Sequence, residues 1–226
     1  MTLSAAATTL TPAFAVSNSV TDSVSVSTPT ETTMIAVLPE IKPVVFPRAT
    51  EQPIAQTTSN PYHDVPFYSQ FTDITPVEWQ KVGCGIASVA MLIDFYSAEV
   101  VSVDTLLKEG IAANAFLSDA GWTHNGLINL SKQFGLDGDS YSLSHLTMES
   151  AFVELERVVK EGPVMVSVHY TFQPTNPIPH LAVVTGIDND RVYYNDPAET
   201  IGQKSISIEQ FQSAWKKRYI EIRPAA

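Results

Sequence analysis

The sequence contains one cysteine, Cys84, among its 226 residues. A single cysteine excludes an intramolecular disulfide, and it leaves no CxxC pair for a zinc site or a dithiol redox centre. Lys and Arg are also scarce, at 13 against 24 Asp and Glu, which gives a formal charge of -11. Nucleic acids and anionic membrane surfaces bind clustered cations, so the composition argues against both as partners.

Long hydrophobic runs are missing as well. No uninterrupted apolar run reaches the roughly 18 residues that a transmembrane helix needs, so we expect no membrane span. Hydrophobic residues make up 44% of the chain, which is ordinary for a globular protein. We expect a monomer whose acidic charge serves solubility.

Residues 1-58 differ in composition from the rest of the chain. Ser and Thr are frequent there, aromatic residues are rare, and prolines recur in the second half of the segment. Such a segment cannot bury enough apolar surface to offset the entropy of ordering it. We therefore predict a disordered tail over residues 1-58 and a folded domain over residues 59-226. Residues 35-57 are interpreted as a solvated linker, with an inhibitory segment as the alternative.

The segment LSAAATTLTPAFAVS ends in a small-x-small pattern at Ala13-Phe14-Ala15, typical of a signal-peptidase site. The basic residues that begin a signal peptide do not precede it. A true start farther upstream would explain the pattern, and plain low complexity is the alternative. We expect export from a bacterial cell, to the surface or beyond, with a cytoplasmic location as the alternative.

The folded part begins with helices and ends with strands. Apolar spacing predicts a helix that begins at Cys84 and is buried nearly all round. Further helices are predicted at residues 103-109, 123-135 and 147-162, and a short one at 211-215. Strands are predicted at residues 164-171, 181-187, 191-197 and 218-224. Helices followed by an antiparallel sheet indicate an α+β fold.

His180 and Asp196 stand at the outer ends of two neighbouring predicted strands. If their hairpin is centred on Asn189, residues whose numbers sum to 378 face one another, so Asp196 lies opposite Ala182. His180 is then a diagonal neighbour of Asp196 on the same sheet face, roughly 7 to 8 Å away between Cα atoms. A two-residue turn would shift the register by one and separate the two side chains. We therefore predict a three-residue loop or an equivalent bulge.

Cys84, His180 and Asp196 together have the composition of a nucleophilic thiol site. An imidazole can take the thiol proton and return it to a leaving group, while a carboxylate fixes its tautomer. The backbone N–H of Cys84 can supply one oxyanion donor, and Gln70 or Gln80 the other. The alternative for the cysteine is a small core residue. Three scattered ligands make a poor metal site, so we expect no metal and no organic cofactor.

Five motifs occur in order: YHDVPFYSQ, GCGIASVAMLIDFY, GWTHNGLINLSKQFGL, GPVMVSVHY and HLAVVTGIDNDRVYYNDP. They resemble the motifs of cysteine peptidase family thirty-nine, relatives of the double-glycine peptidases that mature bacteriocins. The resemblance covers about residues 62-222. It implies a papain-like fold, with a buried nucleophile helix packed on a C-terminal antiparallel sheet.

The resemblance also implies roles for four residues. Cys84 would be the nucleophile and His180 the base. Asp196 would orient the imidazole, and Gln70, inside VPFYSQ, would be the oxyanion donor. The 14 positions between Gln70 and Cys84 exceed the usual papain-like spacing, so Gln80 stays an alternative. The best-known relatives are cytoplasmic domains fused to exporters, so double-glycine specificity is not carried over.

The other candidates receive structural interpretations. We interpret His169 as a sheet-surface or cleft-wall residue. His124 is interpreted as a residue at the start of a helix, with a place in the cleft wall as the alternative. Trp79 and Trp122 are assigned to the core or to the cleft wall. The proline-rich loop at residues 174-179 is expected to shape one wall of the cleft.

The predicted function is thiol-dependent hydrolysis of peptide bonds through a thioester, acting on a peptide or protein substrate. Two alternatives remain open. One is amidase or transglutaminase-type acyl transfer with the same triad, and the other is a catalytically silent peptide-binding module.

Overall fold

The computed structural model describes residues 60–97, 100–118 and 121–226. The predicted tail and the small-x-small pattern within it lie outside these described residues. The assignments of a signal, a stalk or an inhibitory segment therefore stay predictions.

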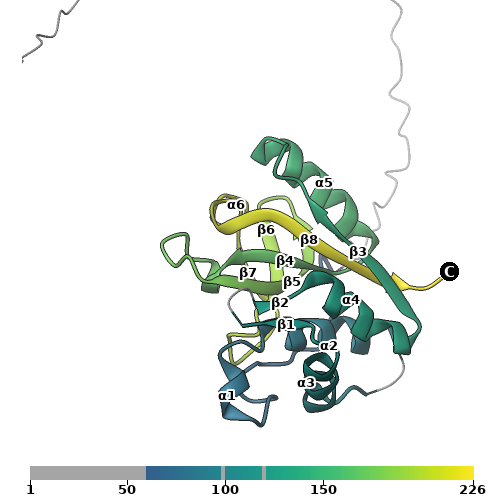
Figure 1. Cartoon of the computed structure of the whole chain (residues 1–226). Coiled ribbons are helices and arrows are strands. Elements are labelled where there is room, and N and C mark those ends of the chain that lie inside the picture. Colours follow the sequence, from purple (N-terminus) through teal and green to yellow (C-terminus); the bar gives the residue numbers. More distant parts are fainter. Residues whose placement is uncertain (1–59, 98–99, 119–120) are drawn as a thin grey trace, which may run out of the picture. The chain divides into compact units, whose positions relative to one another are not determined.

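An antiparallel sheet of six strands forms the centre of the fold, in the order β3-β8-β4-β5-β6-β7 (Figure 1). The α+β class and the antiparallel sheet expected from the sequence are confirmed. The strands are β3 (Leu136–Ser142), β4 (Val164–His169), β5 (Pro179–Asp188), β6 (Arg191–Asn195), β7 (Lys204–Ser207) and β8 (Trp215–Pro224).

Helices cover both faces of this sheet (Figure 1). On one face lie α1 (Val77–Gln80), α2 (Cys84–Tyr96), α3 (Val103–Ala112), α4 (His124–Ser131) with the 3-10 turn η1 (Lys132–Phe134), and the small hairpin β1 (Phe116–Leu117) and β2 (Gly121–Trp122). On the other lie α5 (Met148–Glu161), α6 (Ile208–Ala214) and the 3-10 turn η2 (Tyr170–Phe172). Alternate residues of β4 enter the two cores, Met165 toward α2 and Val166 toward α5.

The helix starts follow the capping chemistry that the sequence indicates. The Thr147 side chain accepts a hydrogen bond from Ser150 N, and the Ser207 side chain accepts one from Gln210 N. Each bond satisfies a backbone N–H that has no partner within its helix. Gly135 adopts φ 71°, the left-handed conformation that ends the α4 and η1 segment.

The β5–β6 hairpin corrects one detail of the sequence analysis. Its turn has two residues, Asn189 and Asp190, so the predicted three-residue loop is wrong. A bulge at Thr185 then shifts the register, and Val183 pairs with Asn195 farther along the strands. The bulge was the predicted alternative to the loop. It gives the outer end of the hairpin the register expected from the sequence, in which paired residue numbers sum to 378.

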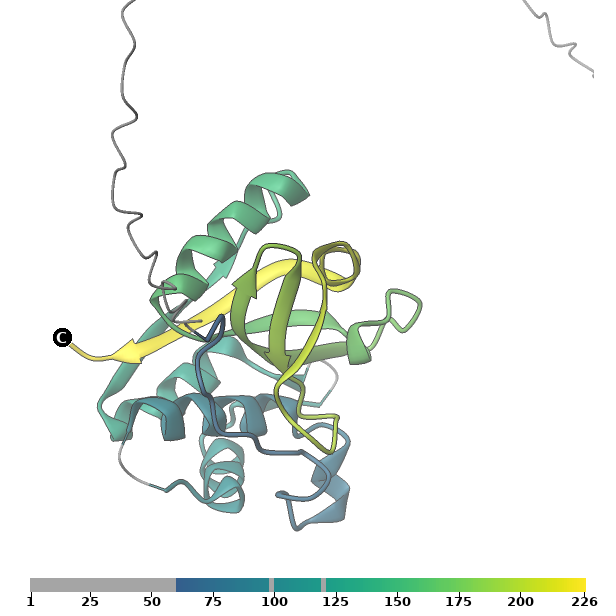
Figure 2. The ribbon, with the colours of Figure 1, turned by 180° about the vertical axis from the view of Figure 1, so that it is seen from behind.

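The first described segment holds this bulge in place. The carbonyl oxygen of Thr185 accepts a hydrogen bond of 2.8 Å from His63 N, so the bulged residue has a partner outside the sheet. A side chain at Gly186 would meet the Pro61 carbonyl oxygen and the backbone of Tyr62. The chain that enters the domain therefore passes directly over the bulge (Figure 2).

The sequence pattern does not predict the edge strand β3. Its residues LDGDSYS are mostly exposed and polar and show no apolar alternation. It forms because β8 offers a complete antiparallel partner, from Leu136 opposite Pro224 to Ser142 opposite Arg218. Gly138 is required there, since a Cβ would collide with the carbonyl oxygen of Glu221.

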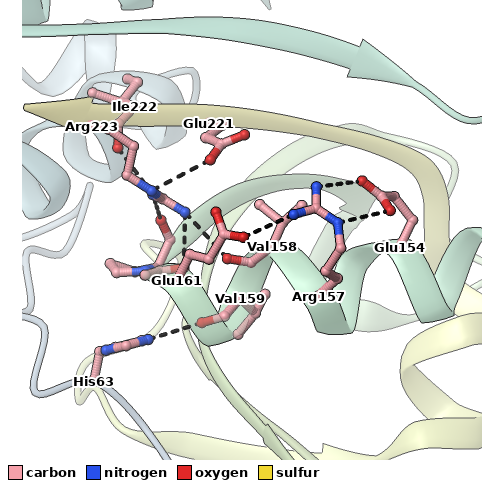
Figure 3. Close-up of polar contacts among 11 residues, drawn as sticks. His63, Glu154, Arg157, Val158, Val159, Glu161, Glu221, Ile222 and Arg223 are labelled. Carbon is pink, nitrogen blue, oxygen red and sulfur yellow. Dashed lines mark hydrogen bonds and ion pairs between the residues drawn. The ribbon is translucent and has the colours of Figure 1, made fainter. Parts of the chain in front are cut away.

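Arg223 of β8 joins the sheet to the end of α5 (Figure 3). Its guanidinium donates to the carbonyl oxygens of Val158 at 3.3 Å, Gly162 at 3.2 Å and Pro163 at 2.6 Å. The last carbonyls of a helix have no partner within the helix, so this side chain satisfies groups that would otherwise be unpaired. Arg157, in contrast, pairs with carboxylates on the exposed side of the same helix.

We predict that Arg223→Ala lowers the free energy of unfolding by about 2 to 3 kcal/mol, because it leaves buried carbonyls without donors. Arg157→Ala is the matched control, since it removes only exposed ion pairs and should have a much smaller effect. Denaturant unfolding of both variants measures the difference. Equal losses in the two variants would contradict the assignment.

Candidate active site

Cys84 is the first residue of α2 and is half-buried, while residues 85–93 of this helix are all buried. The helix is also tied to the sheet, since Ser88 Oγ donates to the Leu181 carbonyl oxygen at 3.4 Å. Gly83 precedes the cysteine, and a Cβ there would meet the side chain of Ile74. Packing therefore fixes the sulfur at a helix start, next to β5.

His180 and Asp196 lie together at the outer end of the β5–β6 hairpin. His180 Nε2 and Asp196 Oδ1 are 2.5 Å apart, and each side chain is only 1% exposed. The same carboxylate oxygen accepts a hydrogen bond of 2.8 Å from Ala198 N. The structure thus brings these two predicted site residues onto one face, in a hydrogen bond shielded from water.

Cys84 and His180 line the same cleft, and the thiol and the imidazole each shift the pKa of the other. Because Nε2 of the ring faces Asp196, the nitrogen left for the sulfur is Nδ1. The ring of Tyr170 packs edge-on against the imidazole, with 5.0 Å between the ring centroids. The imidazole is therefore hydrogen-bonded to the Asp196 carboxylate and electrostatically coupled to the Cys84 thiol.

The electrostatics of these three residues favour a charged pair. Burial alone would raise the pKa of the Cys84 thiol, but the hydrogen bond and the charge of His180, with backbone N–H groups of Leu181 and Gly85, lower it overall. Burial would lower the pKa of His180, but its hydrogen bonds to Asp196 and Cys84 raise it overall. A lowered thiol pKa beside a raised imidazole pKa describes a thiolate-imidazolium pair.

The two candidate glutamines differ in how their amides are used. Gln80 Nε2 donates to the carbonyl oxygens of Phe71 at 3.1 Å and Ile74 at 2.9 Å, so both of its hydrogens brace that loop. Gln70 is 1% exposed and donates from Nε2 to the Gln80 carbonyl oxygen at 2.7 Å. That bond uses one of the two amide hydrogens of Gln70.

The segment that carries Gln70 is anchored beside Asp196. Gln70 N donates to the Pro197 carbonyl oxygen at 2.8 Å, and Asn195 Nδ2 donates to the Val65 carbonyl oxygen at 3.1 Å. The VPFYSQ and NDP motifs, more than a hundred positions apart, therefore lie side by side. Their contact links the oxyanion candidate to the carboxylate.

A cleft of about 570 Å³ opens onto Cys84 and His180. Trp122 forms part of one wall, and its Nε1 donates to the Val82 carbonyl oxygen at 2.7 Å. The end of the proline-rich loop, at Ile178 and Pro179, also lines the cleft, as the sequence indicates. His124 is the first residue of α4 and also lines this cleft, which was the alternative that the sequence left open.

Sequence reasoning missed further lining residues from β4 and β8. They are Ser167, Lys216 and Arg218. No local motif marks them, because only the order of the strands brings them to the cleft.

Residues 62–221 match the model of the Peptidase_C39 like family. The chain belongs to this family. None of the curated proteins that were compared matches the chain.

The chain is also similar to solved structures of peptidases. A double glycine motif protease from an AMS/PCAT transporter, crystallised with its leader peptide, matches with 22% identity and a TM-score of 0.50, covering 73% of this chain and 94% of that one. The Streptococcus ComA peptidase domain matches with 22% identity and a TM-score of 0.49, covering 64% and 93%. A putative C39-like peptidase from Bacillus anthracis has 22% identity and a TM-score of 0.49, covering 70% and 94%. The family expected from the sequence is confirmed by the match to the family model, and the papain-like fold by the structure with a TM-score of 0.50.

Each helix among the described residues is too short or too polar to span a lipid bilayer. In the same part of the chain, no group of three or more His, Cys, Asp or Glu side chains is placed to hold a metal ion.

We predict that iodoacetamide alkylates Cys84 with a rate that reaches its plateau well below pH 8.5, the pKa of a free thiol. Asp196→Asn removes the charge that stabilises the imidazolium, so the pKa of His180 falls and the thiolate loses its partner. The alkylation midpoint should then move upward, toward that of free cysteine. Alkylation that is quenched at set times and followed by mass spectrometry measures the rate against pH for both proteins. Identical pH profiles of the wild type and Asp196→Asn would contradict the proposed interaction of Cys84 with His180.

Proposed function

We propose that the chain is a cysteine peptidase that uses Cys84 as nucleophile and His180 as its acid and base. Asp196 orients the imidazole and stabilises its charge. The observation that carries the proposal is the buried hydrogen bond between His180 and Asp196 beside Cys84, which lines the same cleft as His180. Membership of a peptidase family supports it.

The mechanism proceeds through a thioester. The Cys84 thiolate attacks the carbonyl carbon of the scissile peptide bond, and the carbonyl oxygen takes the negative charge. The protonated His180 then donates its proton to the leaving nitrogen, and the C–N bond breaks. Neutral His180 next takes a proton from a water molecule, whose oxygen attacks the thioester carbonyl. The C–S bond breaks, which releases the acid and restores the ion pair.

Two donors are available for the oxyanion. The first N–H groups of a helix have no partner within it, so the backbone N–H of Cys84 is one donor. Gln70 Nε2 is the other, because it retains a hydrogen after its bond to the Gln80 carbonyl. Gln80 is the weaker candidate, since its amide is bound to two loop carbonyls.

The substrate in this proposal is a peptide or an unfolded segment of a protein. The AMS/PCAT relative was crystallised with a leader peptide, which supports a peptide as the occupant of the corresponding cleft. The reaction draws on side chains and water alone. In this proposal the catalytic domain comprises residues 59-226. The composition of residues 1-58 suggests that the protein is exported and carries this segment as a tail.

We predict that Cys84→Ala and His180→Ala each abolish peptide cleavage, since each removes a group that makes or breaks bonds. Gln70→Ala should lower kcat by about 10² to 10³, as the loss of one oxyanion donor does. Gln80→Ala is the matched control and should act mainly on the stability of its loop. Cleavage of a peptide library, followed by mass spectrometry, measures these rates. Wild-type rates in Cys84→Ala would exclude the mechanism.

Acyl transfer to amines is the alternative for the same three residues. We predict that cleavage in the presence of a primary amine, such as free lysine, gives carboxylate products with little transamidated product. The reason is that the cleft is open and admits water to the thioester. Mass spectrometry separates the two products, and a dominant amide product would assign the site to a transferase.

A further inference from the structure

The charge of the cleft is opposite to that of the chain. The sequence has 24 acidic and 13 basic side chains, yet the lining of the cleft includes three cations, Lys81, Lys216 and Arg218. No Asp or Glu is among the described residues that line it. The protein as a whole is acidic, but the charged side chains that line the cleft are all positive. This distribution of charge favours the binding of anionic groups in the cleft.

The cleft cations lack acidic partners among the described residues. Among the eight other Lys and Arg side chains that the structure describes, four form an ion pair, as Lys132 does with Asp137 and Lys204 with Glu199. Within residues 60–97, 100–118 and 121–226, no carboxylate forms an ion pair with Lys81, Lys216 or Arg218. Three charges that are unneutralised within the described structure therefore face the space in front of Cys84.

The sheet places two of these cations at a defined distance from the reactive residues. Val168 pairs with His180 on one side and with Trp215, the neighbour of Lys216, on the other. Adjacent strands lie about 4.8 Å apart, so β8 runs about 10 Å from the strand of His180. That span corresponds to about three residues of extended peptide. A substrate side chain near the scissile bond can therefore reach this strand.

The third cation comes from a different part of the fold. Lys81 lies in the turn between α1 and α2, three positions before Cys84. Lys81 therefore lines the cleft from the helical part of the fold, whereas Lys216 and Arg218 line it from β8. A peptide in the cleft meets cations from two parts of the fold.

The positive charges that line the cleft repel one another. Burial and the charge of Arg218 both lower the pKa of Lys216, and the same two causes lower the pKa of His124. Such repulsion opposes folding unless an anion neutralises it. A bound carboxylate between Lys216 and Arg218 would remove it.

From this arrangement we propose that the cleft selects acidic peptides, with carboxylates next to the scissile bond held by Lys216 and Arg218 on one side and Lys81 on the other. The inference rests on the proposed peptidase function and names its substrate class. The carboxylate can be an Asp or Glu side chain or the free C-terminus of a short peptide. The experiment separates these two sources.

The first test measures kcat/KM on peptide libraries in which one position near the cleaved bond is fixed as Glu or as its neutral isostere Gln. We expect about tenfold preference for Glu at low salt, falling toward equality near 1 M salt, where the Debye length is about 3 Å. Each library is made with a free and with an amidated C-terminus. A preference that follows the C-terminus identifies the terminal carboxylate as the recognised group, and one that follows Glu identifies the side chain.

Variants test the assignment to these cations. The double variant Lys216→Gln and Arg218→Gln should reduce the preference for Glu to less than about twofold. Lys108→Gln, an exposed position on α3 outside the cleft, makes the same kind of change and should keep the full preference. Thermal unfolding verifies that the variants are folded. An undiminished preference in the double variant would overturn the inference.

A binding measurement separates this inference from the proposed function. Cys84→Ala is titrated by calorimetry with an alternating Glu-Ala octapeptide and with its Gln-Ala counterpart. Tighter binding of the Glu peptide supports the selective cleft even when the wild-type protein cleaves nothing, and in that case only the peptidase proposal fails. Equal affinity, together with equal cleavage of Glu and Gln libraries, would refute the acidic substrate class and leave the peptidase standing.

Discussion

The hydrogen bond between His180 and Asp196 depends on the register of the β5–β6 hairpin, and that register depends on one bulge. The two-residue turn alone would place Asp196 on the face opposite His180, because a shift of one residue exchanges the faces of a strand. The bulge at Thr185 reverses that shift before the strands reach the site. Its carbonyl oxygen is bound by His63 N, so the segment entering the domain helps to set the geometry of a pair that it does not touch.

The same entering segment connects the other parts of the site. It continues to Gln70, whose backbone N–H is bound by the Pro197 carbonyl oxygen directly after Asp196. It then passes into the turn that leads to Cys84, where a side chain on Gly83 would meet Ile74. The nucleophile, the oxyanion candidate and the carboxylate are thus positioned by contacts of one stretch of backbone. This explains physically why the first and last sequence motifs occur together in one site.

The sequence was sufficient for features that depend on local chemistry. Helix caps such as Thr147 and the strand period of β4 follow from residue types and spacing. The sequence was insufficient where a contact with a residue far away in the chain determines the local structure. The strand β3 is polar and forms because β8 pairs with it, and the choice between loop and bulge depends on His63. His124 reaches the cleft only through the packing of α4, and no spacing in the sequence indicates that.

The cleft cations show how an acidic protein can still attract acidic peptides. At physiological ionic strength the Debye length is about 8 Å, so carboxylates spread over the distant surface are largely screened from a peptide at the cleft. Lys216 and Arg218 act within that length, and they already repel one another in the free protein. A carboxylate placed between them gains their attraction and relieves their repulsion together. The free energy that opposes folding at this site therefore becomes part of the affinity for an acidic substrate, which couples substrate binding to the stability of β8.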